Sequence, residues 1–201
     1  MEIKKTSLQW VSTLYKRSAT KYIVVHHTAS TSDLTIKDIE RIHLNEDYAG
    51  VGYHLYIDKN GVIWEGRPID TIGSHALPIN SISVSVCVSG NFEVEQPNQK
   101  QLTALKEVLN YFKTTYPNAK IITHSQVKDT EECKAEAKRT GNSLSYYATA
   151  CCGKNLIKLL QEKEEIKLFA HNNKIRAFAN GKWYGAKIAQ NINLEVKLIE
   201  E

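Results

Sequence analysis

The sequence predicts an α/β fold: a central, mostly β, sheet flanked by helices, followed by a small C-terminal β appendage. Short runs of β-branched and aromatic residues alternate with segments of helical apolar spacing along most of the chain. The length of 201 residues fits one domain with a small extension. We therefore expect a main domain over residues 1–161 and an appendage over residues 162–201.

The composition excludes several classes of protein. Hydrophobic residues make up 42% and charged residues 24%, which argues against disorder, collagen and coiled coil. No apolar run is long enough to span a membrane, and no apolar segment follows Lys4 and Lys5, so we predict neither membrane association nor a signal peptide. The net charge of +4 is too small to indicate nucleic acid, but it suits an anionic polymer such as a cell wall.

The first third of the chain predicts helices and strands in alternation. Apolar spacing favours a short helix over Ser7–Leu14, and the run Tyr22–Val25 is typical of a buried strand. Thr35 is a good N-cap for a helix that continues to Leu44. Two further strands joined by the turn Lys59-Asn60-Gly61 are expected at Tyr53–Ile57 and Val62–Glu65.

The middle of the chain predicts the rest of the main domain. Ile82–Ser89 alternates strictly between apolar and small residues, which indicates a strand whose small face lies under a closely packed helix. Asn98 is a good N-cap for a helix that ends before Pro117. Ile121 and Ile122 lead a strand into His124.

The last third changes in character. Residues 128–148 are polar and highly charged and predict a long surface excursion, and a helix is expected over Gly153–Leu160. Strands are expected at Ile166–Ala170, Lys174–Ala179 and Leu194–Ile199. An appendage of about 40 residues is near the lower limit for an independent core, so we expect it to dock or to pair with another chain.

The four cysteines are too sparse for a disulfide scaffold, and the adjacent Cys151 and Cys152 are poorly placed to bridge each other. Metal ligation is the alternative. His26 and His124 each follow a predicted strand, and such strand ends gather at one rim of an open sheet. Cys151 precedes a helix, whose N-terminus favours a thiolate.

A donor set of two histidines and one cysteine leaves the fourth tetrahedral position open, as in a catalytic zinc site. From chemistry alone, two core histidines with satisfied hydrogen bonds are the commoner arrangement. Seven short sequence motifs bear on the choice. In chain order they are YIVVHHTAS (Tyr22–Ser30), GVGYHLYI (Gly50–Ile57), KNGVIWEGRP (Lys59–Pro68), GSHA (Gly73–Ala76), SVSVCVSGNF (Ser83–Phe92), THSQV (Thr123–Val127) and TACCGKNL (Thr149–Leu156).

Across Tyr22–Leu160 these motifs resemble the zinc-dependent N-acetylmuramoyl-L-alanine amidases of the type 2 family, which share a fold with peptidoglycan-recognition proteins. The resemblance implies a Zn²⁺ cofactor held by His26, His124 and Cys151. It implies catalytic roles for Tyr53 and for Thr149, whose hydroxyl helps to stabilise the oxyanion. The implied reaction is hydrolysis of the amide between N-acetylmuramic acid and L-alanine in peptidoglycan.

Two departures from the family pattern concern the cysteine. Cys151 follows His124 by 27 residues, farther than the family usually places it, and Cys152 stands where the family usually has proline. Cys133 is closer to His124, but it lacks the threonine and glycine of the family motif, so we favour Cys151. Residues 128–148 are then an insertion beside the groove, acting as a lid, a substrate contact or a passive loop.

Further residues are candidates for substrate contact. His75, Trp64 and Arg67 are predicted to bind substrate, although His75 also fits a role in stabilising its turn. Strand alternation places only one of His26 and His27 toward the metal, and it turns His54 away. His43 on its amphipathic helix is expected to be only partly buried, and Cys87 is expected to be an inert buried thiol.

The resemblance implies an enzyme that lyses cell walls, either an endolysin or an autolysin, with peptidoglycan or muropeptides as its partner. An endolysin without a signal peptide is made in the cytoplasm and released by lysis or through a holin-type pore. The appendage is predicted to bind the wall or to form a homodimer. The alternative is a recognition module that binds muropeptides without cutting them. Such modules usually lack the cysteine ligand, so Cys151 favours the enzyme.

Overall fold

The computed structural model describes residues 1–161, 167–171, 174–179 and 182–184. Internal contacts divide the chain into two units, Met1–Lys158 and Leu159–Glu201. The first unit is built around a five-stranded sheet with the strand order β3-β2-β4-β1-β5. The strands of this sheet are β1 (Tyr22–His27), β2 (Leu55–Ile57), β3 (Ile63–Glu65), β4 (Ser83–Val88) and β5 (Lys120–Thr123).

The sheet is mixed. β1 lies between β4 and β5 and runs parallel to both, and β2 also runs parallel to β4. β3 alone is antiparallel, since it forms a hairpin with β2 through the predicted turn at Gly61. All side chains of β1 and β4 are buried, as expected for parallel strands covered on both faces. The predicted α/β class is therefore confirmed.

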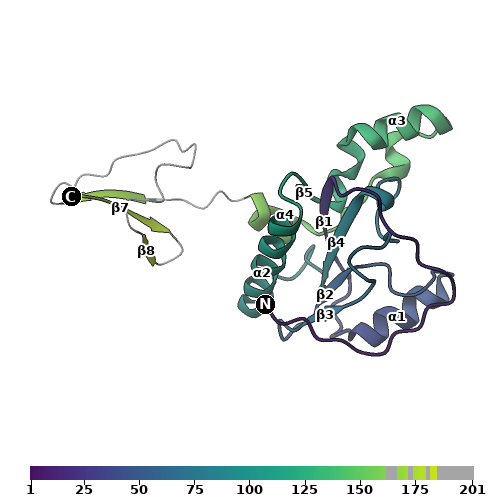
Figure 1. The fold of residues 1–201 in the computed structure, drawn as a ribbon, viewed down its shortest axis with the longest axis horizontal. Helices are drawn as coiled ribbons and strands as arrows, with labels where there is room; N and C mark the ends of the chain where they lie inside the picture. The colour runs from purple at the N-terminus through teal and green to yellow at the C-terminus, as the bar shows by residue number, and fades with distance from the viewer. Residues whose placement is uncertain (162–166, 172–173, 180–181, 185–201) are drawn as a thin grey trace. The chain divides into compact units, whose positions relative to one another are not determined.

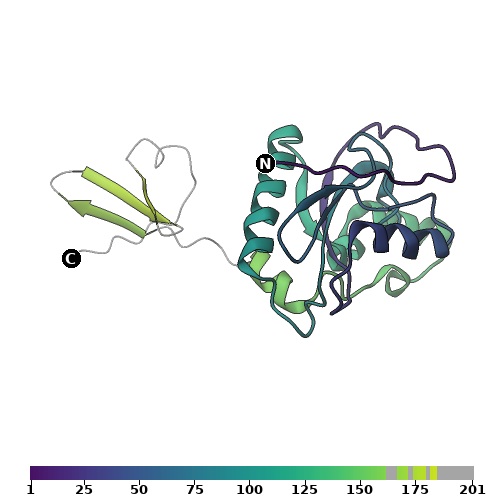
Figure 2. The same cartoon turned by 90° about the horizontal axis from the view of Figure 1, so that it is seen from below.

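Helices α1 (Ile36–Asn45) and α2 (Gln99–Thr115) cover opposite faces of this sheet (Figures 1 and 2). Both begin at the predicted caps. The side chains of Thr35 and Asn98 each accept a hydrogen bond from the backbone N–H three residues later, in a capping box. Cys87 of β4 packs in the cluster that contains the apolar side of α1, which explains why its strand carries small residues on this face.

The predicted helix over Ser7–Leu14 is wrong, because this segment has no regular secondary structure and bends at Val11 and Ser12. Leu8 and Trp10, two residues apart, both pack against the core, whereas Val11 is 59% exposed. Gly50 makes room for the indole of Trp10, since a Cβ there would lie 2.6 Å from the ring. Burial with a period of two is incompatible with one face of a helix.

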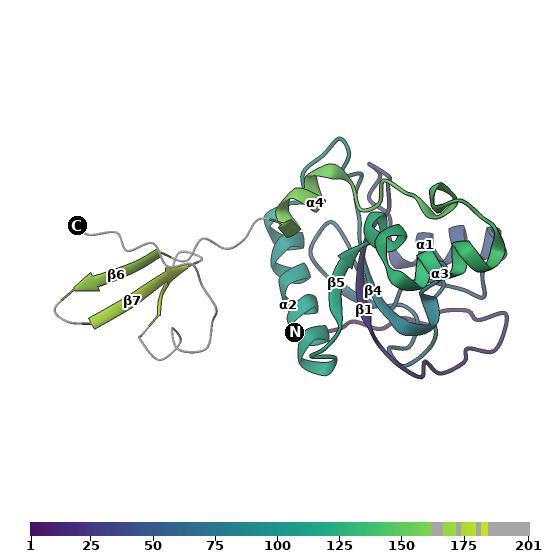
Figure 3. The same ribbon diagram turned by 90° about the horizontal axis from the view of Figure 1, so that it is seen from above.

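The predicted surface excursion at residues 128–148 contains helix α3 (Glu131–Thr140), which lies outside the sheet (Figure 3). Thr130 caps its start, and Gly141, with φ of 76°, ends it in the left-handed conformation. Glu132 anchors the helix to the main domain: its carboxylate accepts hydrogen bonds from Tyr22 Oη at 2.6 Å and Lys21 Nζ at 2.9 Å.

The remaining elements complete the described chain. Short 3₁₀ helices lie beside β4 and on both sides of α3. No helix of the described residues has the length and apolar character needed to cross a bilayer. A three-stranded antiparallel sheet, in the order β6-β7-β8, belongs to the second unit. The elements that complete the described chain are η1 (Asn80–Ile82), η2 (His124–Asp129), η3 (Leu144–Tyr147), α4 (Lys154–Gln161), β6 (Lys167–His171), β7 (Lys174–Ala179) and β8 (Lys182–Tyr184).

The C-terminal strands agree with the sequence in part. β6 and β7 correspond to the first two predicted strands, whereas β8 was not expected. The predicted strand Leu194–Ile199 lies outside the described residues. The roles expected for residues 162–201, wall binding or dimerisation, stay predictions.

Candidate functional site

Two histidines meet at the carboxyl ends of neighbouring parallel strands. His26 is near the end of β1, and His124 directly follows β5. Because Val25 is in register with Thr123, the next residue on each strand reaches the same rim. The ring centroids of His26 and His124 are 4.6 Å apart. Parallel pairing of the two strands therefore explains why these histidines, 98 residues apart in sequence, lie together.

Cys151 joins the histidines from a loop just before α4. Its Sγ lies 3.6 Å from His26 Nδ1, and one ligand atom each from His26, His124 and Cys151 all lie within 4.8 Å of one another. The N–H of His27 donates to Cys151 Sγ at 3.4 Å, and Ser125 N–H donates to the Cys151 carbonyl at 2.5 Å. The alternative ligand, Cys133, is fully buried on α3 and is not part of this cluster.

The three residues line an open cavity of about 490 Å³ at the rim of the sheet. The end of α1 and the residues that follow it contribute to its lining, and so does the loop after β4. The described residues that line it include no lysine or arginine. They are His26, His27, Thr28, Ala29, His43, Glu46, Tyr48, Tyr53, Ser74, His75, Asn91, Glu93, His124, Thr149, Ala150 and Cys151.

Burial controls the protonation of the cluster. It holds the pKa of His26 well below its usual value, with the neighbouring histidines adding to the effect, and it lowers the pKa of His124 to about 4. Both rings are therefore neutral near pH 7 and present bare nitrogen atoms. Burial raises the pKa of Cys151 to about 12, so the thiol needs a cation to become a thiolate.

Both residues with predicted catalytic hydroxyls, Tyr53 and Thr149, line the cavity. The ring centroid of Tyr53 lies 5.1 Å from that of His26. Burial, together with the nearby thiols Cys87 and Cys151, raises the pKa of Tyr53 well above its usual value, so its hydroxyl stays protonated. Thr149 Oγ1 accepts the N–H of Cys151 at 3.2 Å, which leaves the threonine proton available to another acceptor.

The three predicted substrate contacts fall in different places. His75 lines the cavity, and its ring is 5.0 Å from that of His26. Trp64 and Arg67 are not among the lining residues. The indole of Trp64 donates to Asp58 Oδ2 at 2.9 Å. Arg67 is 5% exposed and donates to backbone carbonyls, including that of Val51 at 2.9 Å.

Sequence reasoning missed His43. This residue lines the cavity with its ring centroid 5.1 Å from that of Tyr53. Its Nδ1 accepts the N–H of Gly52 at 3.0 Å, so the neutral ring carries its proton on Nε2. The GVGYH motif contains this backbone donor, but the motif alone does not connect Gly52 to His43.

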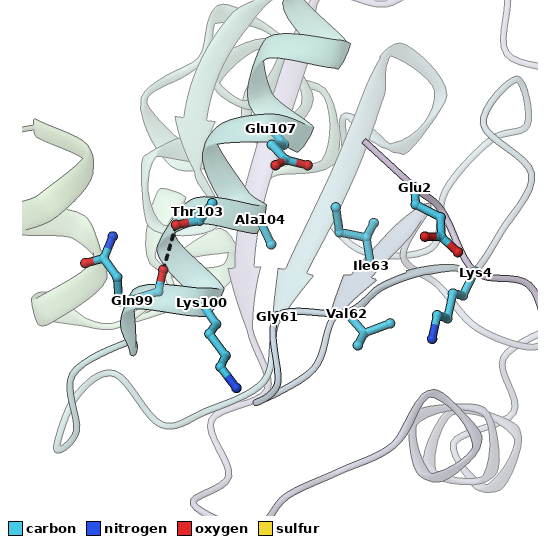
Figure 4. A pocket seen from close by; sticks show the side chains of 10 residues that line it. All are labelled: Glu2, Lys4, Gly61, Val62, Ile63, Gln99, Lys100, Thr103, Ala104 and Glu107. Atoms are coloured by element: carbon cyan, nitrogen blue, oxygen red, sulfur yellow. Dashed lines mark hydrogen bonds between the residues drawn. The ribbon is translucent and has the colours of Figure 1, made fainter. Parts of the chain in front are cut away.

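A second cavity, of about 420 Å³, lies between the N-terminal segment, the β2–β3 hairpin and α2 (Figure 4). Apolar side chains, including Val62, Ile63 and Ala104, sit beside the charged Glu2 and Lys4. Its lining contains no histidine, cysteine or tyrosine, whereas the three clustered metal-ligating side chains found among the described residues line the first cavity.

A mixed sheet with two neutral histidines and a thiol converging in an open rim cavity defines a class of protein that can hold a catalytic transition metal. Comparison with known families specifies the class. The family model described as N-acetylmuramoyl-L-alanine amidase matches residues 16–136, more than half of the chain. The chain therefore belongs to this amidase family, which confirms the predicted hydrolase class and the resemblance on which it rested.

Individual relatives agree with this assignment. An endolysin of Enterobacteria phage K11 is 34% identical over 119 residues, covering 56% of this chain and 79% of that protein. Peptidoglycan-recognition protein LB of Drosophila melanogaster is 32% identical over 122 residues, covering 55% of this chain and 53% of that protein. The structure of the N-acetylmuramoyl-L-alanine amidase LysC from Clostridium intestinale has a TM-score of 0.64 at 27% identity, covering 81% of this chain and 99% of that one.

Proposed function

We propose that this amidase cleaves the bond between N-acetylmuramic acid and L-alanine with a zinc ion held by His26, His124 and Cys151. The observation that carries the proposal is the convergence of these three ligand atoms, within 4.8 Å of one another, in an open cavity. When bound, zinc would polarise the scissile carbonyl and make water a better nucleophile near neutral pH.

The donor set fits zinc on chemical grounds. Imidazole nitrogen and thiolate sulfur are the ligands that zinc prefers, and three protein ligands leave a position for water or substrate. Both histidines are neutral near pH 7, as ligation requires. The N–H of His27 points at Cys151 Sγ and supports negative charge on the sulfur.

The hydroxyls of Tyr53 and Thr149 serve the oxyanion that develops as the carbonyl is attacked. Tyr53 is protonated at neutral pH and is suited to donate rather than to accept. Thr149 is oriented by its bond from the Cys151 N–H, so its own proton is free for the carbonyl oxygen. Each such donor typically contributes about 100- to 1,000-fold in turnover.

The likeness to phage endolysins supports a role in cell-wall lysis. In this proposal peptidoglycan is the substrate, release from the producing cell occurs by lysis or through a holin-type pore, and residues 162–201 bind the wall or pair two chains. The insertion at residues 128–148 ends directly before Thr149, but none of its own residues lines the cavity, so in this proposal any contact with substrate lies beyond the cavity itself.

The test combines metal content with product analysis. Elemental analysis is run beside digestion of purified peptidoglycan, with and without a chelator. We expect one zinc per chain and chelator-sensitive appearance of new L-alanine amino termini. Absence of both zinc and cleavage, with muropeptide still bound, would refute the proposal and indicate a recognition module.

A further inference from the structure

The ring of His26 is hydrogen-bonded to His75 through the edge that faces away from Cys151. Its Nε2 lies 3.1 Å from Nδ1 of His75, while its Nδ1 faces Cys151 Sγ at 3.6 Å. One ring nitrogen is thus engaged by another histidine, and the opposite one is directed at the ligand cluster. A neutral histidine carries one ring proton. If that proton is on His26 Nε2, toward His75, then His26 Nδ1 has a free lone pair and can bind a metal.

Ser83 determines where that proton lies. Its hydroxyl carries a single proton, and the Ile79 carbonyl at 2.7 Å can only accept, so the serine donates there. Ser83 Oγ can then only accept from His75 Nε2, at 3.3 Å. A neutral His75 that carries its proton on Nε2 presents a bare Nδ1 to His26. His26 therefore carries its proton on Nε2 and has a lone pair on Nδ1.

The loop around His75 fixes this ring in place. Gly73 lies directly against it, since a Cβ there would come 2.3 Å from His75 Cδ2. Asn80 Oδ1 accepts the backbone N–H groups of His75 and Ala76, each at 2.8 Å. The GSHA motif thus supplies the space for the ring, and Asn80 supplies the turn that carries it.

We propose that His75 and Ser83 are positioning residues, which order the protons so that His26 presents its Nδ1 lone pair to the metal. This inference rests on the zinc site of the proposed function. It also bears on the predicted substrate contact, because both nitrogens of His75 are already hydrogen-bonded. Loss of such an outer partner typically weakens metal affinity by about 10- to 100-fold.

The first test measures zinc affinity by competition with a chromophoric chelator. His75→Leu, which cannot accept a proton from His26, is expected to bind zinc about 10- to 100-fold more weakly than the wild type. His75→Asn is expected to recover most of the affinity, because an amide Oδ1 can replace the ring Nδ1 as acceptor. Unchanged affinity in His75→Leu would overturn the proposal.

Ser85→Ala is the matched control. Ser85 lies two residues after Ser83 on β4, is equally buried, and bonds instead to His54 at 3.0 Å. We expect Ser83→Ala to weaken zinc binding and Ser85→Ala to leave it at the wild-type level. Equal losses in the two variants would indicate a general packing effect and would contradict the proposal.

The second test needs no substitution. In zinc-free, ¹⁵N-histidine-labelled protein, NMR reports which nitrogen of each ring is protonated, and His26 is expected as the Nε2–H tautomer. An Nδ1–H tautomer would refute the proposed proton order. If the wild type bound no zinc, the proposed function would fail at its first step. If zinc affinity did not change when His75 is substituted, only the positioning role would be refuted.

Discussion

His26 and His124 stand at the ends of two hydrogen-bonded parallel strands, whereas Cys151 stands in a loop that follows residues 128–148. The family match covers both histidines but ends at residue 136, inside α3 and before the cysteine. The histidines are thus positioned by sheet register, which sequence pattern predicts well. The cysteine is positioned by a few specific contacts beyond an insertion.

Those contacts explain how the loop tolerates the insertion. Ser125, directly after His124, donates its N–H to the Cys151 carbonyl, so the chain returns to the point where it left the rim. Gly153, with φ of 84°, runs so close to Phe92 that a Cβ would lie 2.5 Å from its carbonyl carbon. The chain between these points can lengthen without moving the sulfur, since surface loops tolerate insertions well.

The largest expected effect tests which cysteine belongs to the site. Cys151→Ala removes the thiolate donor and is expected to lose zinc and to lower turnover by on the order of 1,000-fold or more. Cys133→Ala, on α3, is expected to keep both, because its thiol is outside the cluster. Metal analysis and peptidoglycan digestion check the pair, and zinc retained by Cys151→Ala would contradict the ligand assignment.

The next effect separates binding from chemistry. Tyr53→Phe is expected to keep zinc and to lose about 100-fold or more in turnover, because it removes one oxyanion donor. Tyr56→Phe is the matched control. Its hydroxyl donates to the Leu34 carbonyl at 2.5 Å in the core, so its loss is expected to lower thermal stability with turnover retained. Near-normal turnover in Tyr53→Phe would remove that residue from the mechanism.

Much of the sheet and both main helices could be predicted, because their signals are local. A continuous run of β-branched and aromatic residues marked β1, strict alternation marked β4, and Thr35 and Asn98 cap their helices as expected. The segment Ser7–Leu14 was mispredicted because its structure depends on Gly50, about 40 residues away. Helix α3 was missed because it buries few apolar side chains, Cys133 and Ala137 among them.

The site shows the same division between local and distant signals. His26 and His124 could be predicted from strand ends, and Cys151 from its resemblance to a family motif. His43 could not, because its role in the cavity depends on a hydrogen bond from Gly52 across a turn. The bond between His26 and His75 also joins segments 49 residues apart in sequence, which no periodicity reveals.

A smaller effect tests the loop that carries the cysteine. Thr149→Val removes the hydroxyl that accepts from Cys151 N–H and is free to donate, so we expect about 100-fold lower turnover with weaker zinc binding. Thr149→Ser retains the hydroxyl and is expected to stay within about threefold of the wild type. If the serine variant fails as badly as the valine variant, the methyl group rather than the hydroxyl is what matters.

The smallest expected effect concerns the anchor of the insertion. Partial burial opposes ionisation of Glu132, but hydrogen bonds from Tyr22 and Lys21 outweigh it and lower its pKa in the folded state. Since the folded pKa lies below the unfolded one, the carboxylate stabilises the fold above about pH 4.5, and this contribution disappears as pH falls through the folded pKa. Glu132→Gln is expected to cost about 1 kcal/mol near pH 7 and less at pH 3.

Tyr22, which belongs to the same anchor, has the opposite pH dependence: its contribution to folding stability is lost at high pH. Burial, followed by the bond to Glu132, raises the pKa of Tyr22 to about 12. Its contribution is therefore complete below pH 10 and lost as pH rises toward 12, so Tyr22→Phe should flatten the alkaline arm of the stability curve. Urea unfolding across pH checks both variants. Zinc affinity that stays constant in both would mean that the cysteine loop is held independently of the insertion, as the Ser125 and Gly153 contacts imply.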